Sequence, residues 1–224
     1  MKKTIGIIGV GRFGLNLVES FSKNNVELLV IDYNKERAEK AGLITPYVVV
    51  SDSTDLDSLK KTGIETCDHV IVAFGQDDET NIATTIMTVI RLKTLGIKRI
   101  TVRVDDDSLI EAMTLVGATD IISPLKIASD KIANKLSSDS VIDYYNVTDE
   151  FDAYQIALKE DFKGLAILEL NSRTKYIINI LLVKRNGKYL IPNRETTLEA
   201  RDELIIFGKK KDINKIIAFF DTFV

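Results

Sequence analysis

The N-terminal stretch Thr4-Ile5-Gly6-Ile7-Ile8-Gly9-Val10-Gly11-Arg12-Phe13-Gly14 decides the fold. Its β-branched first half predicts a buried strand, and its second half predicts the start of a helix. Between them, Gly9, Gly11 and Gly14 follow the spacing G-x-G-x-x-G. Gly9 allows a tight turn, Gly11 lets a diphosphate approach the backbone, and Gly14 lets the helix pack closely on the strand. The stretch therefore predicts the first turn of a nucleotide-binding βαβ unit.

Asp32 ends the next predicted strand and supplies the second half of such a site. A carboxylate there can accept hydrogen bonds from both ribose hydroxyls, and it repels a 2′-phosphate, which disfavours NADP. Arg12 lies inside the glycine turn, where a guanidinium can hold a phosphate through two hydrogen bonds. The alternative is a turn that uses glycine for geometry alone, with Asp32 capping the next helix. Turn, strand and acid together favour the nucleotide site.

Short β-branched segments alternate with longer amphipathic segments over residues 4–122. This alternation predicts βαβ units and a parallel sheet. Runs that are apolar on both faces, such as Val48-Val49-Val50, are typical of a sheet covered by helices on both sides. The predicted strands are 4–10, 27–32, 47–51, 69–74, 99–104 and 120–122, and the predicted helices are 13–24, 35–41, 55–62, 79–95 and 107–116.

The pattern changes after Pro124. A helix is predicted over 125–136, followed by strands at 154–158, 176–184 and 203–209, a turn at Asn186-Gly187 and a closing helix over 211–220. We expect an α/β chain in three parts. These are a Rossmann-like parallel-sheet, nucleotide-binding domain over 1–123, a crossover helix and linker over 124–138, and a small α/β C-terminal lobe over 139–224.

Composition excludes several classes of protein. The chain has 224 residues, with 30 Lys and Arg against 33 Asp and Glu and a formal net charge of −3. That balance argues against binding nucleic acid through overall charge, and no basic face interleaved with aromatic residues points to such a partner. One Cys and one His exclude a disulfide framework and a Cys/His zinc site. With no apolar run near the roughly 18 residues of a membrane helix, we expect a soluble cytoplasmic protein.

Further candidate nucleotide contacts end predicted strands, at the sheet edge where such folds bind ligands. Asp52-Ser53-Thr54 could hold an adenine or cap the following helix. Ala73-Phe74-Gly75 borders the same crevice, and Arg103 could reach a phosphate; each could instead be structural. The candidate nucleotide-binding set is Gly9, Val10, Gly11, Arg12, Phe13, Gly14, Asp32, Tyr33, Asp52, Ser53, Thr54, Ala73, Phe74, Gly75 and Arg103.

The sequence presents no catalytic or metal-binding constellation. His69, the only imidazole, starts a predicted strand at the end away from the crevice, and Cys67 lies beside it. Asp105-Asp106-Asp107 fits a solvated loop and a helix cap better than a metal site. Hydride transfer usually needs an acid–base group and a substrate pocket, so an NAD-dependent dehydrogenase is the weaker alternative. A free-standing redox or nucleotide sensor is a third possibility.

Several motifs resemble those of the RCK (regulator of K⁺ conductance) family, the cytosolic regulatory subunits of bacterial Trk and Ktr potassium transporters. In the N-terminal part the resemblance rests on 7–14 with its Gly-Arg-Phe-Gly turn, and on 30–32, 52–54, 70–73 and 117–124. In the C-terminal part it rests on 170–176, 191–192 and 200–204. It covers nearly the whole chain and is closer to the Ktr type than to the Trk type, whose chains carry two tandem copies.

The resemblance implies chains that dimerise and form an octameric ring under a membrane-embedded potassium channel subunit, at the inner face of the plasma membrane. It implies ATP or ADP in the Rossmann crevice, or NAD(H) as in Trk relatives, with Arg12 at the phosphates and Asp32 at the ribose. It also implies cyclic di-AMP at the C-lobe dimer interface. The matching positions there, which on their own indicate only strand and turn packing, are Arg173, Ile178, Asn179 and Pro192.

Two positions depart from the pattern of the family. Thr114 stands where several Ktr-type chains have a Glu that serves a cation near the γ-phosphate, and Ile177 stands where many chains have Gly after Tyr. The predicted crossover helix adds a separate expectation. Its apolar stripe of Ile127, Ile132 and Leu136 exceeds what its own lobe needs, so we expect it to pair with another subunit rather than only face its own domain.

Overall fold

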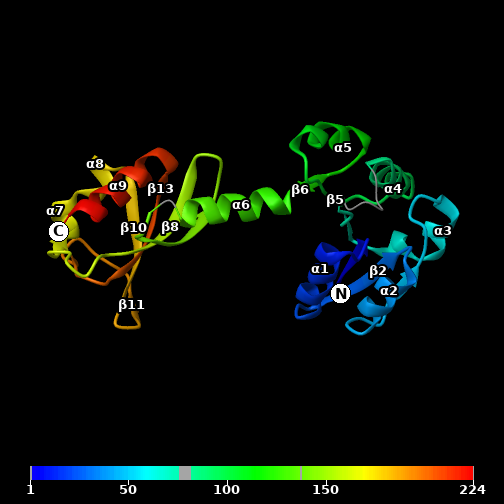
Figure 1. Cartoon of the computed structure of the whole chain (residues 1–224), viewed down its shortest axis with the longest axis horizontal. Helices are drawn as coiled ribbons and strands as arrows, with labels where there is room; N and C mark the ends of the chain where they lie inside the picture. Colours follow the sequence, from blue (N-terminus) through cyan, green and yellow to red (C-terminus); the bar gives the residue numbers. More distant parts are fainter. Residues whose placement is uncertain (1, 76–81, 137, 224) are drawn as a thin grey trace. The chain divides into compact units, whose positions relative to one another are not determined.

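A computed structural model describes residues 2–75, 82–136 and 138–223 of the chain (Figure 1). The chain divides into two compact units between Lys126 and Ile127, called here the N-lobe and the C-lobe. The sequence-based domain limits of 123 and 138 lie on either side of this division, and they stay predictions.

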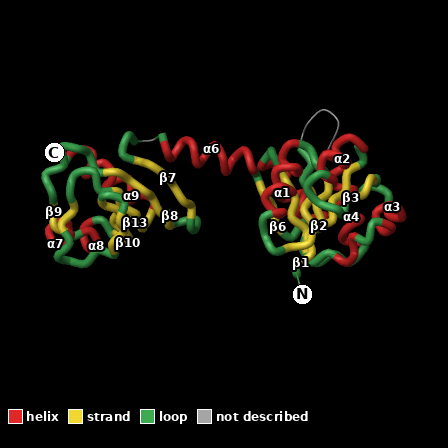
Figure 2. The backbone as a smooth tube through the Cα atoms, turned by 90° about the horizontal axis from the view of Figure 1, so that it is seen from below, coloured by secondary structure: helices red, strands yellow, loops and turns green. Residues whose placement is uncertain are grey.

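The N-lobe is built on a six-stranded parallel sheet in the order β3-β2-β1-β4-β5-β6. Figure 2 shows strands of this sheet in yellow among the red helices of the lobe. This is the doubly wound Rossmann order, in which the chain reverses direction across the sheet between β1 and β4. The predicted α/β fold class is confirmed. The strands are β1 (Lys3–Ile8), β2 (Val26–Asp32), β3 (Val48–Val50), β4 (His69–Val72), β5 (Ile100–Arg103) and β6 (Asp120–Ile122).

Helices connect these strands where amphipathic segments predicted them. They are α1 (Arg12–Ser22), α2 (Lys35–Gly42), α3 (Leu56–Lys61), α4 (Ile82–Thr94) and α5 (Ile110–Val116), with 3₁₀ turns η1 (Ile64–Thr66) and η2 (Asp107–Leu109). The helix predicted over 107–116 is thus divided into η2 and α5. Of the helix predicted over 79–95, residues 79–81 lie outside the described residues.

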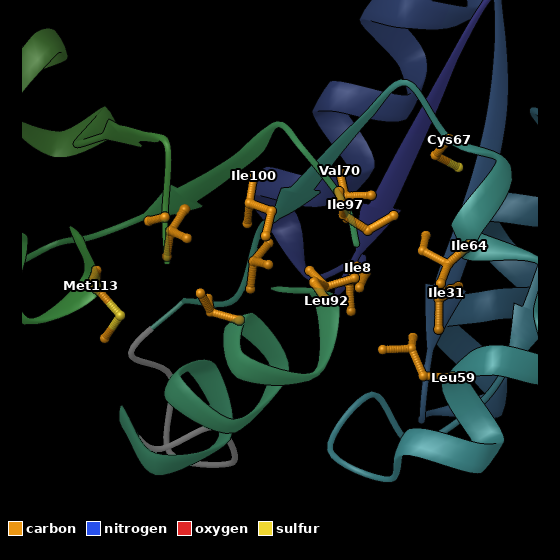
Figure 3. Packing of buried hydrophobic residues seen from close by; sticks show 14 of the residues in the cluster. Ile8, Ile31, Leu59, Ile64, Cys67, Val70, Leu92, Ile97, Ile100 and Met113 are labelled. Carbon is orange, nitrogen blue, oxygen red and sulfur yellow. The ribbon is translucent and has the colours of Figure 1, made fainter. Parts of the chain in front are cut away.

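Apolar side chains cover both faces of the N-lobe sheet. On one face Ile8, Ile31 and Ile100 pack with Leu59 and Leu92 (Figure 3). On the other face a second cluster contains Ile5, Ile7 and Val30 from the strands, together with Val18 of α1. Neighbours in a strand point to opposite faces, so both clusters draw on β1 and β2. This explains why the central residues of β2, 28–31, are apolar without interruption.

The C-lobe contains a five-stranded antiparallel sheet in the order β11-β10-β13-β8-β7 and a small β12-β9 pair. Its strands are β7 (Val141–Asn146), β8 (Phe151–Ala157), β9 (Leu165–Ala166), β10 (Ile178–Arg185), β11 (Lys188–Leu190), β12 (Thr197–Leu198) and β13 (Glu203–Lys209). Its helices besides α6 are α7 (Ile167–Leu170), α8 (Ser172–Lys175) and α9 (Lys210–Thr222). Ile213, Ile216 and Phe220 of α9 are buried in one core with residues of β8, β10 and β13.

Helix α6 (Pro124–Lys135) is the predicted crossover helix, and each of its residues is at least partly exposed. Lys131 pairs with Asp143 at 3.2 Å, and the Tyr154 hydroxyl donates to Asn134 Oδ1 at 3.0 Å. The apolar stripe of Ile127, Ile132 and Leu136 is exposed. Its pairing with another subunit stays a prediction. No helix in the described part of the chain is long and apolar enough to cross a bilayer.

Candidate nucleotide crevice of the N-lobe

The glycine turn between β1 and α1 forms as the sequence predicts, and its glycines serve different purposes. Gly9 has a φ of +91° and donates its N–H to the Ile31 carbonyl at 2.8 Å. A Cβ on Gly14 would lie 1.9 Å from the Gly9 carbonyl oxygen, so this position needs the missing side chain for packing. A Cβ on Gly11 would meet nothing within 4 Å. Gly11 therefore faces open space, as close approach of a ligand requires.

Asp32 joins the end of β2 to this turn. Its side chain is buried, with the residue only 4% exposed. Oδ2 accepts the Val10 N–H at 2.6 Å and Oδ1 accepts the Asn34 N–H at 2.8 Å. The alternative role as a helix cap is wrong for Asp32, because Asn34 caps α2 by accepting the Arg37 N–H at 3.0 Å. A carboxylate has about four acceptor sites, so Asp32 keeps capacity for ribose hydroxyls.

A pocket of about 270 Å³ opens at the carboxyl ends of β1, β2 and β4. Parallel α/β sheets bind ligands at this edge. The structure brings six of the predicted residues together in its lining, namely Asp32, Tyr33, Asp52, Ser53, Thr54 and Phe74. Sequence reasoning missed Ile8, Ser51 and Thr84. Ile8 and Ser51 adjoin predicted segments, whereas Thr84 comes from α4 and gave no local signal.

The other predicted nucleotide contacts lie beside this pocket rather than in its lining. Val10 and Ala73 are buried, and their N–H groups donate to Asp32 Oδ2 and to the Ile8 carbonyl. Arg12 is the first residue of α1 and is exposed next to Gly11. The remaining ones, at the turn and at the ends of β4 and β5, are Gly9, Gly11, Phe13, Gly14, Gly75 and Arg103.

The segment after β3 is held by its own hydrogen bonds. Asp52 Oδ1 accepts the Thr54 N–H at 2.8 Å and the Thr54 hydroxyl at 2.7 Å, and the Ser53 and Thr88 hydroxyls lie 2.7 Å apart. Asp55, not the segment before it, caps α3 by accepting the Ser58 N–H. Hydrogen bonds from Ser58 lower the pKa of the Asp55 carboxyl. Residues 52–54 therefore border the pocket without serving as the cap.

The acidic run at 105–107 is divided among separate roles. Asp105 pairs with Arg103, Asp106 caps η2 by accepting the Ser108 N–H at 2.9 Å, and Asp107 pairs with Lys126. The predicted helix cap is confirmed at Asp106. Among the described residues, no group of three His, Cys, Asp or Glu side chains could hold a metal ion.

His69 and Cys67 lie at the opposite edge of the sheet, where β4 begins, as expected. His69 Nε2 is 2.7 Å from the Thr101 hydroxyl, and burial together with Arg99 and Lys3 lowers the pKa of its imidazole. Burial raises the pKa of the Cys67 thiol to about 11. A neutral, buried thiol is a poor nucleophile, so Cys67 belongs to the packing of the lobe.

A second pocket of about 440 Å³ lies in the C-lobe, between the α7–α8 segment and the loop after β11. Arg173 and Pro192, two of the four positions matched to cyclic di-AMP, line it, together with residues that sequence reasoning missed, such as Asn193 and Arg194. Ile178 is buried in the C-lobe core and Asn179 lies on β10, both outside that lining.

The structure also describes the surroundings of Thr114 and Ile177, the two positions noted above as departures from the family pattern. Thr114 is exposed on α5 and its hydroxyl donates to the Ile110 carbonyl. Ile177 has a φ of +54°, in the left-handed region that favours glycine, and its carbonyl oxygen lies 3.0 Å from where a Cβ on Gly208 would stand. This backbone conformation suits glycine better than isoleucine.

Several solved structures share this fold. The chain matches a structure described as the GsuK channel with a TM-score of 0.64 over 96% of this chain and 39% of that one, at 18% identity. It matches the GsuK RCK domain with a TM-score of 0.53 over 98% and 46%, at 22% identity. The chain spans less than half the length of these solved chains. The fold is that of an RCK chain.

Sequence comparisons then give the family. The TrkA-N domain model matches residues 5–124, and the TrkA-C domain model matches residues 154–221. The chain is 33% identical over 216 residues to Ktr system potassium uptake protein C of Bacillus subtilis (strain 168), covering 96% of both chains. It is 31% identical over 214 residues to protein A of the same system and organism, covering 95% of both. The chain belongs to the RCK family of Ktr and Trk potassium uptake proteins.

Proposed function

We propose that the chain is a nucleotide-sensing regulatory subunit of a Ktr-type potassium uptake system and that it is not an enzyme. The observation that carries the proposal is the meeting of the glycine turn with Asp32, beside a pocket that six predicted residues line. Backbone N–H groups at the start of α1 and the carboxylate of Asp32 can hold a diphosphate and its ribose. Turnover of NAD(H) with hydroxy or amino acids would contradict the non-enzymatic part.

The ligand proposed for the crevice is ATP or ADP, with NAD(H) as the alternative. All three contain a diphosphate unit and an adenosine ribose whose 2′- and 3′-hydroxyls are free, and these groups suit the turn and Asp32. The solved structure described as the GsuK channel bound to NAD, with a TM-score of 0.62 and 18% identity, shares the fold. ATP differs from ADP by a terminal phosphate that Arg12 could contact from the start of α1.

Regulation requires that the ligands bind two states of the protein with different free energies. Moving an equilibrium from 1:99 to 99:1 takes about 5.5 kcal/mol of differential binding. A charge-assisted hydrogen bond contributes about 1.5–3 kcal/mol. Arg12 in a single subunit is therefore insufficient, and we infer that several subunits of one assembly contribute.

The first experiment measures the affinities of the full chain for ATP, ADP and NAD by calorimetry. Arg12→Ala should weaken ATP binding by roughly 10-fold to 100-fold and ADP binding less, because it removes a guanidinium contact to the terminal phosphate. Arg99→Ala is the matched control, since Arg99 is exposed beside His69 at the other edge of the sheet. Equal ATP and ADP affinities in both wild type and Arg12→Ala would contradict the mechanism.

The assembly proposed is a homodimer that forms an octameric ring at the cytoplasmic face of a membrane-embedded potassium transporter subunit. The exposed stripe of Ile127, Ile132 and Leu136 on α6 supports a contact between subunits. The relatives named as Ktr system potassium uptake proteins support the partner.

A second ligand, cyclic di-AMP, is proposed for the C-lobe. The 440 Å³ pocket supports it, because Arg173 and Arg194 line it together with the apolar groups of Ile167 and Pro192. Cationic and apolar groups side by side suit a ligand made of phosphates and adenines.

A further inference from the structure

Arg103, at the end of β5, is held by an ion pair within its own loop. Its Nε donates to Asp105 Oδ1 at 3.0 Å and its Nη2 donates to Asp105 Oδ2 at 2.6 Å. The two side chains are 15% and 8% exposed. A two-point pair shielded from water fixes the guanidinium in one orientation and cancels its charge at longer range.

The same guanidinium borders the glycine turn. Its central carbon lies 5.1 Å from the centre of the Phe13 ring, next to Arg12 in the sequence. Its third nitrogen, Nη1, lies 3.1 Å from where a Cβ on Gly75 would stand, at the carboxyl end of β4. The guanidinium thus lies against the first turn of α1 and the loop after β4, both of which border the crevice.

This arrangement places a neutralised arginine where the phosphates of a nucleotide are expected. ATP carries more negative charge than ADP, and ADP carries more than NAD. We propose that Asp105 sets how strongly the affinity of the crevice depends on the negative charge of its ligand. By neutralising Arg103, Asp105 leaves Arg12 as the cation that contacts the terminal phosphate. It thereby lowers the affinity for the most highly charged ligands. This inference rests on the proposed nucleotide site in the N-lobe.

The test measures calorimetric affinities of the full chain for ATP, ADP and NAD without magnesium, because a divalent cation would mask the charge of the phosphates. Asp105→Asn keeps an acceptor for Arg103 but removes the negative charge. It should tighten ATP binding by roughly tenfold, ADP less and NAD least, with smaller gains at high salt. Arg103→Gln leaves Asp105 unneutralised and should weaken binding in the same order of ligands.

Two further variants separate charge from folding. Asp107→Asn is the matched control, because Asp107 lies two residues from Asp105 and pairs with Lys126 of α6, and both side chains are about half exposed. Breaking a shielded ion pair can destabilise the fold, so thermal unfolding of every variant is recorded. The double variant Arg103→Gln/Asp105→Asn removes both charges and should bring the ratio of ATP to NAD affinity back toward that of wild type.

The outcomes are distinct. The proposal is supported if Asp105→Asn gains affinity in the order of ligand charge and the double variant loses that gain. Equal shifts for the three ligands, or no shift, overturn it while the nucleotide site stands. Failure of wild type to bind any of the three overturns the proposed function, and this inference falls with it. If Asp105→Asn does not fold, the affinities of Arg103→Gln decide. An affinity loss in Arg103→Gln that does not increase with the charge of the ligand overturns the proposal.

Discussion

At the scale of single residues, the three glycines of the turn differ in whether the fold itself requires them. Gly9 has a positive φ, and Gly14 lies against the carbonyl of Gly9, so both are required before any nucleotide arrives. Gly11 has a φ of −61° and open space around its Cα. Of these three glycines, Gly11 is therefore the one that the fold itself does not require.

Alanine substitutions at Gly14 and at Gly11 should affect different properties of the protein. Gly14→Ala should lower the free energy of unfolding by about 1–3 kcal/mol, because its methyl group forces the turn apart. Gly11→Ala should leave the free energy of unfolding within about 1 kcal/mol of wild type, because its φ suits alanine. It should nevertheless weaken ATP binding at least roughly tenfold, because the methyl group occupies the approach to the backbone.

Urea denaturation and calorimetry on the same preparations check both variants. A Gly11→Ala protein that is stable and binds nucleotide like wild type would show that no phosphate approaches this backbone.

At the scale of secondary-structure elements, a polar chain ties three neighbouring strands together at the edge opposite the crevice. His69 of β4 contacts the Thr101 hydroxyl of β5 at 2.7 Å, and that hydroxyl donates to Asp120 Oδ2 of β6 at 3.2 Å. Because Thr101 donates to Asp120, His69 Nε2 acts as the donor to Thr101. The proton on Nε2 thus defines the tautomer of the neutral imidazole.

His69, in this hydrogen-bonded series of side chains, makes the stability of the N-lobe depend on pH. Burial and the cations Arg99 and Lys3 lower the pKa of His69 below its ordinary value of 6.5, against the opposing effect of Asp120. The unfolded chain therefore binds a proton at a higher pH than the folded chain does. The stabilisation is complete above pH 6.5 and is lost as the pH falls through the folded pKa.

Urea denaturation at about pH 7.5 and about pH 5.5 measures the effect in wild type and His69→Gln. Wild type should lose stability between the two pH values, and His69→Gln should lose less, because the chain has no other histidine. Equal losses in both proteins would assign the pH dependence to carboxylates.

Sequence patterns predicted the elements of the N-lobe but not the shortest elements of the C-lobe. The N-lobe strands followed from β-branched runs, and α1 to α5 followed from helical spacing, because burial on both faces of the sheet leaves a strong signal. In the C-lobe, β9 and β12 have two residues each, and α7 and α8 have four. Segments this short carry no measurable period, and tertiary contacts determine them.

The sequence likewise predicted only part of the candidate nucleotide site. Asp32 and the segment 52–54 follow strands of a recognisable sheet, so their meeting at one edge could be deduced from the topology. Thr84 of α4 borders the pocket through packing of a helix, which no local motif encodes. The pairing of Arg103 with Asp105 depends on the path of a loop, so the sequence indicated a cation near the phosphates without revealing that it is neutralised.

At the scale of the whole molecule, α6 leaves apolar surface uncovered. Ile127, Ile132 and Leu136 are 58%, 59% and 76% exposed, although each would gain about 1.5–3 kcal/mol on full burial. The contacts of Lys131 with Asp143 and of Asn134 with Tyr154 use polar positions of the same helix. These contacts, which anchor the helix, are therefore polar, and the three apolar side chains stay exposed.

Replacing these three residues by serine should dissociate the assembly. The loss of apolar burial predicts a dissociation constant raised by roughly 100-fold or more, measured by light scattering over a concentration series. Nucleotide affinity per chain should change little. Lys135→Ser, an exposed change on the same helix, is the control. A wild-type monomer at micromolar concentration would rule out the ring.

The strained backbone at Ile177 links two positions that are far apart in the sequence. Gly208 can carry no side chain while Ile178 Cγ2 and the Ile177 carbonyl stand 2.6 and 3.0 Å from its missing Cβ. Relaxing the left-handed turn would move that carbonyl and change the space at Gly208. Substitutions at the two positions should therefore be epistatic. A side chain at 208 should be accepted only together with a change at 177 that lets this carbonyl move.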